Sequence, residues 1–260
     1  MTESKRLVCV FAHPDDETLG AGSTLAKYAA AGVELYLVTA TRGERGWQGD
    51  PSADPGPQAL GEIRTAELLA AAQVLGIRDV QFLNYLDGDL DQADPAEAIG
   101  RIVSHIRRIQ PQVVITFGPE GSYGHPDHIA ISQLTTAATV RAAEHWAVSK
   151  LYYIAWSEPL WAAYQSVTKK LTSTVDGVER QAVPWPEWEI TTIVDTRGVW
   201  ETVWRAVSCH DSQIVGYGRL GQLPPEQHEA LWGWQRYYRV YSAVNGGRRR
   251  ETDLFEGLRE

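Results

Sequence analysis

The stretch LVCVFAHPDDETLG, residues 7–20, joins an apolar run to a dense group of ionisable side chains. Residues 7–12 have the continuous apolar pattern of a strand that is covered on both faces of a sheet. The ionisable residues that follow directly are His13, Asp15, Asp16 and Glu17. Burying that much charge at the end of a core strand costs on the order of several kcal/mol unless partners, water or a metal compensate it. The stretch therefore predicts either a solvated turn or a site.

Apolar runs alternate with helical patterns through the first half of the chain. The runs lie at residues 7–12, 33–40, 80–85 and 113–118. The helical patterns lie at residues 17–31, 59–75, 95–109 and 126–144. Strands that alternate with helices of this length are typical of βαβ units. We therefore predict an α/β fold with a mostly parallel sheet that is flanked by helices.

The second half of the chain is rich in large aromatic side chains, and nearly all of the 10 tryptophans lie after residue 145. It contains strand patterns at 151–156 and 189–195 and helical patterns at 199–210 and 225–239. Residues 157–188 are irregular, and we expect a substrate lid there. The charged tail GGRRRETD, residues 246–253, is expected to be mobile. We predict a catalytic core over 1–156 and a smaller C-terminal portion over 157–260 that packs on the same domain and completes the pocket.

Composition excludes several classes of partner. The formal net charge of -9 argues against a nucleic-acid surface, which needs a basic patch. No apolar run is long enough to span a bilayer, and the first residues lack a secretory signal, so we expect a cytoplasmic location. The two cysteines, Cys9 and Cys209, form neither a disulfide framework nor a CxxC metal motif, and we expect both in the core.

A second polar stretch, EGSYGHPDH at residues 120–128, follows the fourth strand pattern. Loops at the carboxyl ends of parallel strands converge on one edge of a sheet, so this stretch should meet the loop after residue 12. His-Pro-Asp occurs in both stretches at a strand-to-helix turn, where proline and acidic residues favour a helix start. A helix start explains the prolines and some acids, but it gives no reason for three histidines.

A metal site explains more of the pattern. His13, Asp16 and His128 would supply two imidazole nitrogens and one carboxylate oxygen, and catalytic zinc sites use three such ligands with a fourth position open. Asp15 would remain free as a general base for a bound water. Two histidines and a carboxylate also suit Fe²⁺. An ion-pair network is the remaining alternative.

The pair of stretches AHPDDE (12–17) and GHPDH (124–128) closely resembles the LmbE-like, or PIG-L, family of zinc-dependent N-acetylglucosamine deacetylases. The resemblance implies a Rossmann-like fold and the same metal ligands and base. It also implies three further catalytic residues. His125 assists the tetrahedral intermediate or the leaving amine, Asp127 fixes the tautomer or charge of His125, and Tyr123 lies on a mobile loop that helps to bind the oxyanion.

Other motifs suggest residues that contact substrate. By resemblance, Arg64 in GEIRTAE and Asp87 in LDGDL contact substrate hydroxyls, Glu44 in TRGERG lines the second part of the sugar conjugate, and AVSCHDSQ brings His210 near the pocket. An ordinary surface charge for Arg64 and a structural histidine at 210 stay open. The remaining histidines, expected to be structural or solvated, are His105, His145 and His228.

The sequence thus predicts a zinc-dependent N-deacetylase, with Fe²⁺ as the other candidate metal. It would act on a small molecule that contains N-acetylglucosamine and release acetate and a free amino sugar. An amidase that cleaves a larger amide, such as a mycothiol conjugate, and a non-catalytic carbohydrate-binding protein are the alternatives. A dinucleotide cofactor is excluded because Leu25 replaces the third glycine of the fingerprint. The sequence leaves the oligomeric state open, and the resemblance allows a homo-oligomer, because trimers and hexamers occur in the family.

Overall fold

The computed structural model describes residues 4–167, 172–175, 177–217, 219–245, 247 and 249–258. Its main sheet has seven strands in the order β3-β2-β1-β4-β5-β9-β8. The strands are β1 (Arg6–Phe11), β2 (Glu34–Thr39), β3 (Ile77–Phe82), β4 (Val113–Thr116), β5 (Lys150–Ile154), β8 (Thr192–Asp195) and β9 (Trp234–Ser242). Strands β1 to β5 pair in parallel, and only β9 runs antiparallel to its neighbours β5 and β8. The predicted α/β fold with a mostly parallel sheet is confirmed.

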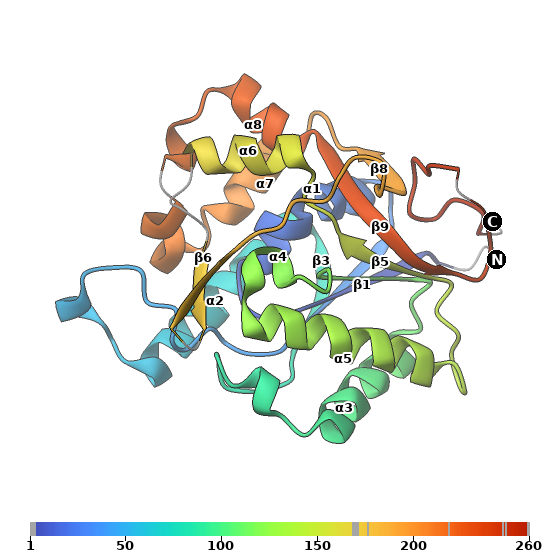
Figure 1. Ribbon diagram of the computed structural model, residues 1–260, viewed down its shortest axis with the longest axis horizontal. Helices are drawn as coiled ribbons and strands as arrows, with labels where there is room; N and C mark the ends of the chain where they lie inside the picture. The colour runs from blue at the N-terminus through green and yellow to red at the C-terminus, as the bar shows by residue number, and fades with distance from the viewer. Residues whose placement is uncertain are drawn as a thin grey trace.

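Helices cover both faces of this sheet (Figure 1). The helices are α1 (Asp16–Ala30), α2 (Pro57–Leu75), α3 (Pro95–Ile109), α4 (Gly121–Gly124), α5 (Pro126–Ala142), α6 (Glu158–Val167), α7 (Trp200–Val207) and α8 (Pro225–Trp232). Short 3-10 turns are η1 (Pro51–Ala53), η2 (Leu90–Gln92), η3 (Asp211–Tyr217) and η4 (Leu220–Gln222). Helix α3 packs beside α5, whereas α1 packs beside α2 and α7. Within the described residues, no helix is both long and apolar enough to cross a bilayer.

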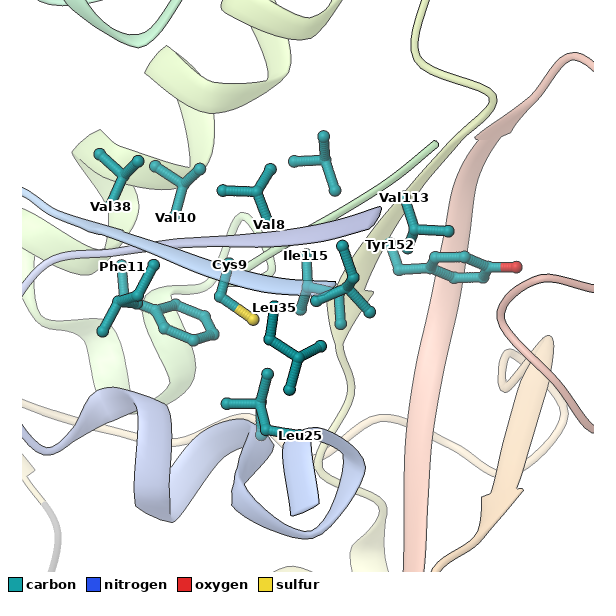
Figure 2. Close-up of a cluster of buried hydrophobic side chains, with 14 of the residues drawn as sticks. Val8, Cys9, Val10, Phe11, Leu25, Leu35, Val38, Val113, Ile115 and Tyr152 are labelled. Carbon is teal, nitrogen blue, oxygen red and sulfur yellow. The ribbon is translucent and has the colours of Figure 1, made fainter. Parts of the chain in front are cut away.

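Strand β1 is buried on both faces, which explains its unbroken apolar sequence. Figure 2 shows Val8 and Val10 on one face of the sheet and Cys9 and Phe11 on the other, towards Leu25 of α1. All five side chains are at most 1% exposed. Cys9 is therefore a core residue as predicted, and burial raises the pKa of its thiol.

The C-terminal portion differs from the sequence expectation in two places. The helical pattern predicted over 225–239 ends at Trp232, and β9 begins at Trp234. Its aromatic and β-branched residues pair with both β5 and β8, so tertiary pairing decides the conformation. Part of the tail that is predicted to be mobile is held in place by Glu251. This side chain is buried, and its Oε1 lies 2.8 Å from Nζ of Lys150.

The irregular segment after residue 156 folds into α6 and a hairpin of β6 (Thr172–Val175) and β7 (Val178–Gln181). In Figure 1 the hairpin lies near α4, which it contacts through both strands. Helices α6, α7 and α8 share a second apolar cluster that includes Trp232, which is 1% exposed. This portion thus contributes β8 and β9 to the same sheet, and its helix α7 packs on α1 and α2.

Candidate active site

A cavity of about 830 Å³ lies at the carboxyl ends of the parallel strands. Strands β1 and β4 are neighbours although they are far apart in sequence, so the strand order reverses between them. Open α/β sheets bind ligands at such a reversal, because the loops that follow the two strands diverge there. The loops after β1 and β4 carry the AHPDDE and GHPDH motifs. Both motifs line the cavity, as the sequence predicts.

The three predicted metal ligands meet at the floor of this cavity. Nδ1 of His13 lies 3.1 Å from Nε2 of His128, which lies 3.4 Å from Oδ1 of Asp16. Oδ2 of Asp16 is 3.8 Å from Nδ1 of His13. All three residues are less than 9% exposed. Two nitrogens and a carboxylate oxygen at these separations, away from solvent, fit the donor set of a divalent metal.

The other ring nitrogen of His13 fixes which nitrogen can bind a metal. Nε2 lies 3.0 Å from Oδ2 of Asp127 and 3.1 Å from Oδ1 of Asp87. Carboxylates only accept hydrogen bonds, so Nε2 carries a proton and the lone pair of a neutral ring is on Nδ1, towards His128. A metal-ligating histidine is usually oriented by such a carboxylate. The family resemblance implies that Asp127 pairs with His125, whereas the structure places the Asp127 carboxylate on His13.

Without a cation, the charges of this cluster conflict. Burial opposes the charge of His13, but the hydrogen bonds with Asp127 and Asp87 outweigh it and raise the pKa of His13 to about 10. Burial raises the pKa of Asp16 to about 8. Burial and the charge of His13 hold the pKa of His128 well below its ordinary value. A bound divalent cation would relieve this conflict, since it favours an ionised Asp16 and neutral imidazoles.

Asp15 occupies the turn between β1 and α1 with a backbone φ of 96°, in the left-handed region that non-glycine residues rarely adopt. Its carboxylate lines the cavity. Oδ2 of Asp15 accepts a hydrogen bond from the hydroxyl of Tyr217 at 3.1 Å and lies 3.3 Å from Nη2 of Arg64. Tyr217 was not predicted from the sequence. It lies in η3, and no local motif relates it to a loop so distant in the chain.

His125, Tyr123 and Asp127 lie after β4, beside His13 and His128. Nδ1 of His125 accepts a hydrogen bond from the backbone N–H of Asp127 at 3.2 Å, so the proton of a neutral ring lies on Nε2. Burial and the charge of His13 lower the pKa of His125 to about 4. The rings of Tyr123 and His128 meet edge-on, with their centroids 5.3 Å apart. Tyr123 follows Ser122, whose φ of 61° is a positive value that non-glycine residues rarely adopt.

Of the four residues predicted to contact substrate, Arg64 and Asp87 line the cavity. Arg64 is 4% exposed, so it is not an ordinary surface charge. Its guanidinium donates to the carbonyl oxygens of Pro14 at 2.5 Å and Gly43 at 3.0 Å. Oδ2 of Asp87 accepts from the backbone N–H of Arg45 at 3.0 Å. Both side chains therefore also hold the loops of the site in place.

Glu44 and His210 are not among the residues that line the cavity. Oε2 of Glu44 accepts from the backbone N–H of Arg42 at 3.2 Å and that of Asp87 at 3.3 Å, so it joins two loops. Nε2 of His210 lies 2.7 Å from Oε1 of Glu17, and both side chains are 0% exposed. Both side chains therefore bond to other parts of the protein and do not line the cavity.

One wall of the cavity comes from Trp156, the last residue of the first half, and from the C-terminal portion. Trp156 and Tyr164 stack with ring centroids 4.8 Å apart, and both line the cavity with Leu220. Thr172 and Thr174 of β6 line it as well. Residues 157–188, where we expect a lid, therefore contribute side chains to the cavity lining.

Comparison with known proteins agrees with this geometry. The family model described as PIG-L, GlcNAc-PI de-N-acetylase, matches residues 8–139. A protein of Kineococcus radiotolerans named 1D-myo-inositol 2-acetamido-2-deoxy-alpha-D-glucopyranoside deacetylase is 35% identical, over 99% of this chain and 84% of its own length. A protein of the same name from Rhodococcus jostii is 35% identical over 98% of both chains.

A solved structure gives the same result for the fold. The conserved protein TT1542 from Thermus thermophilus matches with a TM-score of 0.66 and 25% identity, over 94% of this chain and 98% of its own. The family match includes both the AHPDDE and the GHPDH motif, and the relatives extend the similarity over nearly the whole chain. The chain belongs to the PIG-L family.

Proposed function

We propose that the protein is a zinc-dependent N-deacetylase. Its substrate is a small molecule that contains N-acetylglucosamine, and it releases acetate and a free amino sugar. The observation that carries this proposal is the convergence of His13, Asp16 and His128 beside Asp15 in one cavity. The names of the relatives support an inositol conjugate of N-acetylglucosamine as the substrate. Fe²⁺ is the other metal that this donor set suits.

The residues of the site divide the reaction among them. A zinc ion on His13, Asp16 and His128 would supply Lewis-acid polarisation of the acetyl carbonyl and a water of lowered pKa. Asp15 takes the proton of the attacking water, and its carboxylate is oriented for this by Tyr217 and Arg64.

The tautomer of His125 separates its role from that of Asp15. Because Nδ1 of His125 already accepts a backbone N–H, its ring proton lies on Nε2. Nε2–H of His125 therefore donates to the oxygen that becomes negative, together with the hydroxyl of Tyr123. Asp15, protonated in the first step, then gives its proton to the departing amine. This assignment selects Asp15 as the general acid, a choice that the sequence leaves open.

Polar groups on the β2 and β3 side of the cavity are suited to hydroxyl-rich parts of the substrate. Besides Arg64 and Asp87, the polar side chains that line this side are Gln48, Asp91, Gln92 and Gln213. We assign the sugar and its attached group to this side. A cytoplasmic location stays a prediction of the sequence, and only the resemblance supports a homo-oligomer.

The aromatic wall favours a second candidate substrate. Trp156, Tyr164 and Leu220 make this part of the cavity lining apolar, and Trp156 is the half-buried member, whereas Tyr164 and Leu220 are at most 2% exposed. A larger amide, as in a mycothiol conjugate, would use that surface while the same residues catalyse the reaction. The two candidates differ only in the group that leaves as the carboxylic acid.

The test is an assay of the purified protein with two substrates, before and after chelation. One substrate is the N-acetylglucosamine conjugate of inositol, and the other carries a bulky N-acyl group on the same sugar. Acetate release from the first, lost on chelation and restored by zinc or by anaerobic Fe²⁺, is the expected result. Hydrolysis of only the bulky amide would replace the deacetylase by the amidase. Hydrolysis of neither substrate by metal-loaded protein would contradict both.

A further inference from the structure

The turn that carries Asp15 is held by a buried acid from its own helix. Oε2 of Glu17 accepts the backbone N–H of Asp15 at 3.0 Å. This bond ties down a residue whose φ of 96° is costly for any side chain but glycine. Glu17 is itself 0% exposed, and burying a carboxylate is costly unless both of its oxygens have hydrogen-bond partners.

His210 is the second partner. Nε2 of His210 lies 2.7 Å from Oε1 of Glu17, so one oxygen of the carboxylate faces His210 and the other faces Asp15. A carboxylate only accepts hydrogen bonds, so the imidazole is the donor. The two residues are far apart in the chain, and together they connect the end of α7 to the turn after β1.

The residues that follow His210 fix its position. Ser212 donates to Glu67 of α2 through both its backbone N–H, at 2.7 Å, and its hydroxyl, at 2.8 Å. The side chain of Gln213 donates to the carbonyl oxygen of Gly46, after β2, at 3.1 Å. Residues 210–213 therefore bond to α2 and to the loop after β2, in addition to Glu17 of α1. These bonds hold His210 in place as a donor.

We propose that Glu17 and His210 form a positioning pair, which holds the backbone of Asp15 so that its carboxylate faces the reacting water. The proposal rests on the proposed function of Asp15 as general base. Neither residue lines the cavity, so the pair acts by holding the turn and not by contact with the substrate. The C-terminal portion thereby supports the base of the N-terminal half.

The test compares His210→Leu with His210→Gln, whose side-chain amide can still donate to Glu17. A misplacement of about 1 Å costs about 100-fold in rate, so we expect kcat of His210→Leu to fall by about that factor. KM and metal content should stay within about threefold, because binding residues and ligands are unchanged. His210→Gln should recover most of the loss.

His228→Leu is the matched control. His228 is also a buried histidine of the C-terminal portion, 3% exposed, and it stacks between Trp200 and Trp232 rather than on the site. The His228→Leu substitution should lower Tm and leave kcat unchanged. If His210→Leu lowers Tm as His228→Leu does and keeps kcat within threefold, the pair is merely structural and the proposal is overturned.

A second measurement does not depend on activity. In metal-free protein, amide hydrogen exchange of a peptide that covers residues 12–20 should become faster in His210→Leu and in Glu17→Gln, and should return towards the wild-type rate in His210→Gln. Unchanged exchange in both disruptive variants would overturn the proposal. If the wild-type protein hydrolyses no amide, the proposed function fails, whereas this exchange result still decides whether the pair holds the turn. If His210→Leu does not fold, Glu17→Gln provides both measurements.

Discussion

The half of the chain before residue 157 and the portion after it contribute to one cavity in different ways. The first half supplies the proposed metal ligands and base from the turns and helix starts that follow parallel strands. The second supplies side chains that reach those turns from outside, such as Tyr217 on Asp15 and His210 on Glu17. The groups that we propose to react thus lie at the sheet edge, while some of the groups that orient them come from the second portion.

The largest effect should come from the first half, at a metal ligand. His128→Ala removes one of the three donors around the site, so bound metal and acetate release should both fall below detection. Elemental analysis and an acetate assay measure this. Exposed His145, replaced by alanine, is the control and should keep both. A full complement of metal in His128→Ala would remove His128 from the ligand set.

The base comes next. Asp15→Asn keeps the size of the side chain and the three ligands, but it cannot take a proton, so kcat should fall by about 10³-fold or more. The metal content should equal that of the wild type. Steady-state kinetics with elemental analysis of the same samples separates the two quantities. Activity near the wild-type level would exclude Asp15 as the base.

In the second portion, Glu251 should affect stability rather than rate. Burial would raise the pKa of Glu251, but hydrogen bonds from Lys150 and Tyr152 outweigh it and lower the pKa to about 2. The ordinary value is 4.5, so the folded state favours the ionised form, and its stabilising contribution is present above pH 4.5 and is lost as pH falls towards 2.

Glu251→Gln should therefore lower the free energy of unfolding by about 3 kcal/mol at pH 7, because it leaves Lys150 buried without its counter-charge. The difference from the wild type should shrink as the pH falls from 4.5 towards 2. Urea unfolding at several pH values measures it, and kcat at 25 °C should not change. A difference that is independent of pH would show that the ion pair is not its source.

Tyr217 tests whether the second portion also affects the rate. Tyr217→Phe removes one hydrogen bond to Asp15, worth about 1 kcal/mol, so kcat should fall by about fivefold to tenfold. Tyr241→Phe, on β9 and 45% exposed, is the control and should behave as the wild type. A kcat within twofold of the wild type for Tyr217→Phe would restrict the support of Asp15 to Glu17 and Arg64.

The sequence predicts the first half well because local patterns determine it. Apolar runs such as residues 7–12 identify the strands, and parallel pairing alone brings the loop with His13 to the loop with His128. Pairing with β5 and β8 makes β9 a strand, although its aromatic spacing also suits a helix. The contacts of Glu17 with His210 and of Asp15 with Tyr217 join distant parts of the chain, so no local spacing could reveal them.

The central claim is that His13, Asp16 and His128 hold one catalytic metal beside Asp15. Anomalous X-ray diffraction at the zinc edge, from crystals of the zinc-loaded protein, tests it most directly. The account predicts one strong peak per chain, at about 2.0–2.2 Å from Nδ1 of His13, Nε2 of His128 and an oxygen of Asp16. A zinc peak elsewhere, or none between these three side chains, would contradict it.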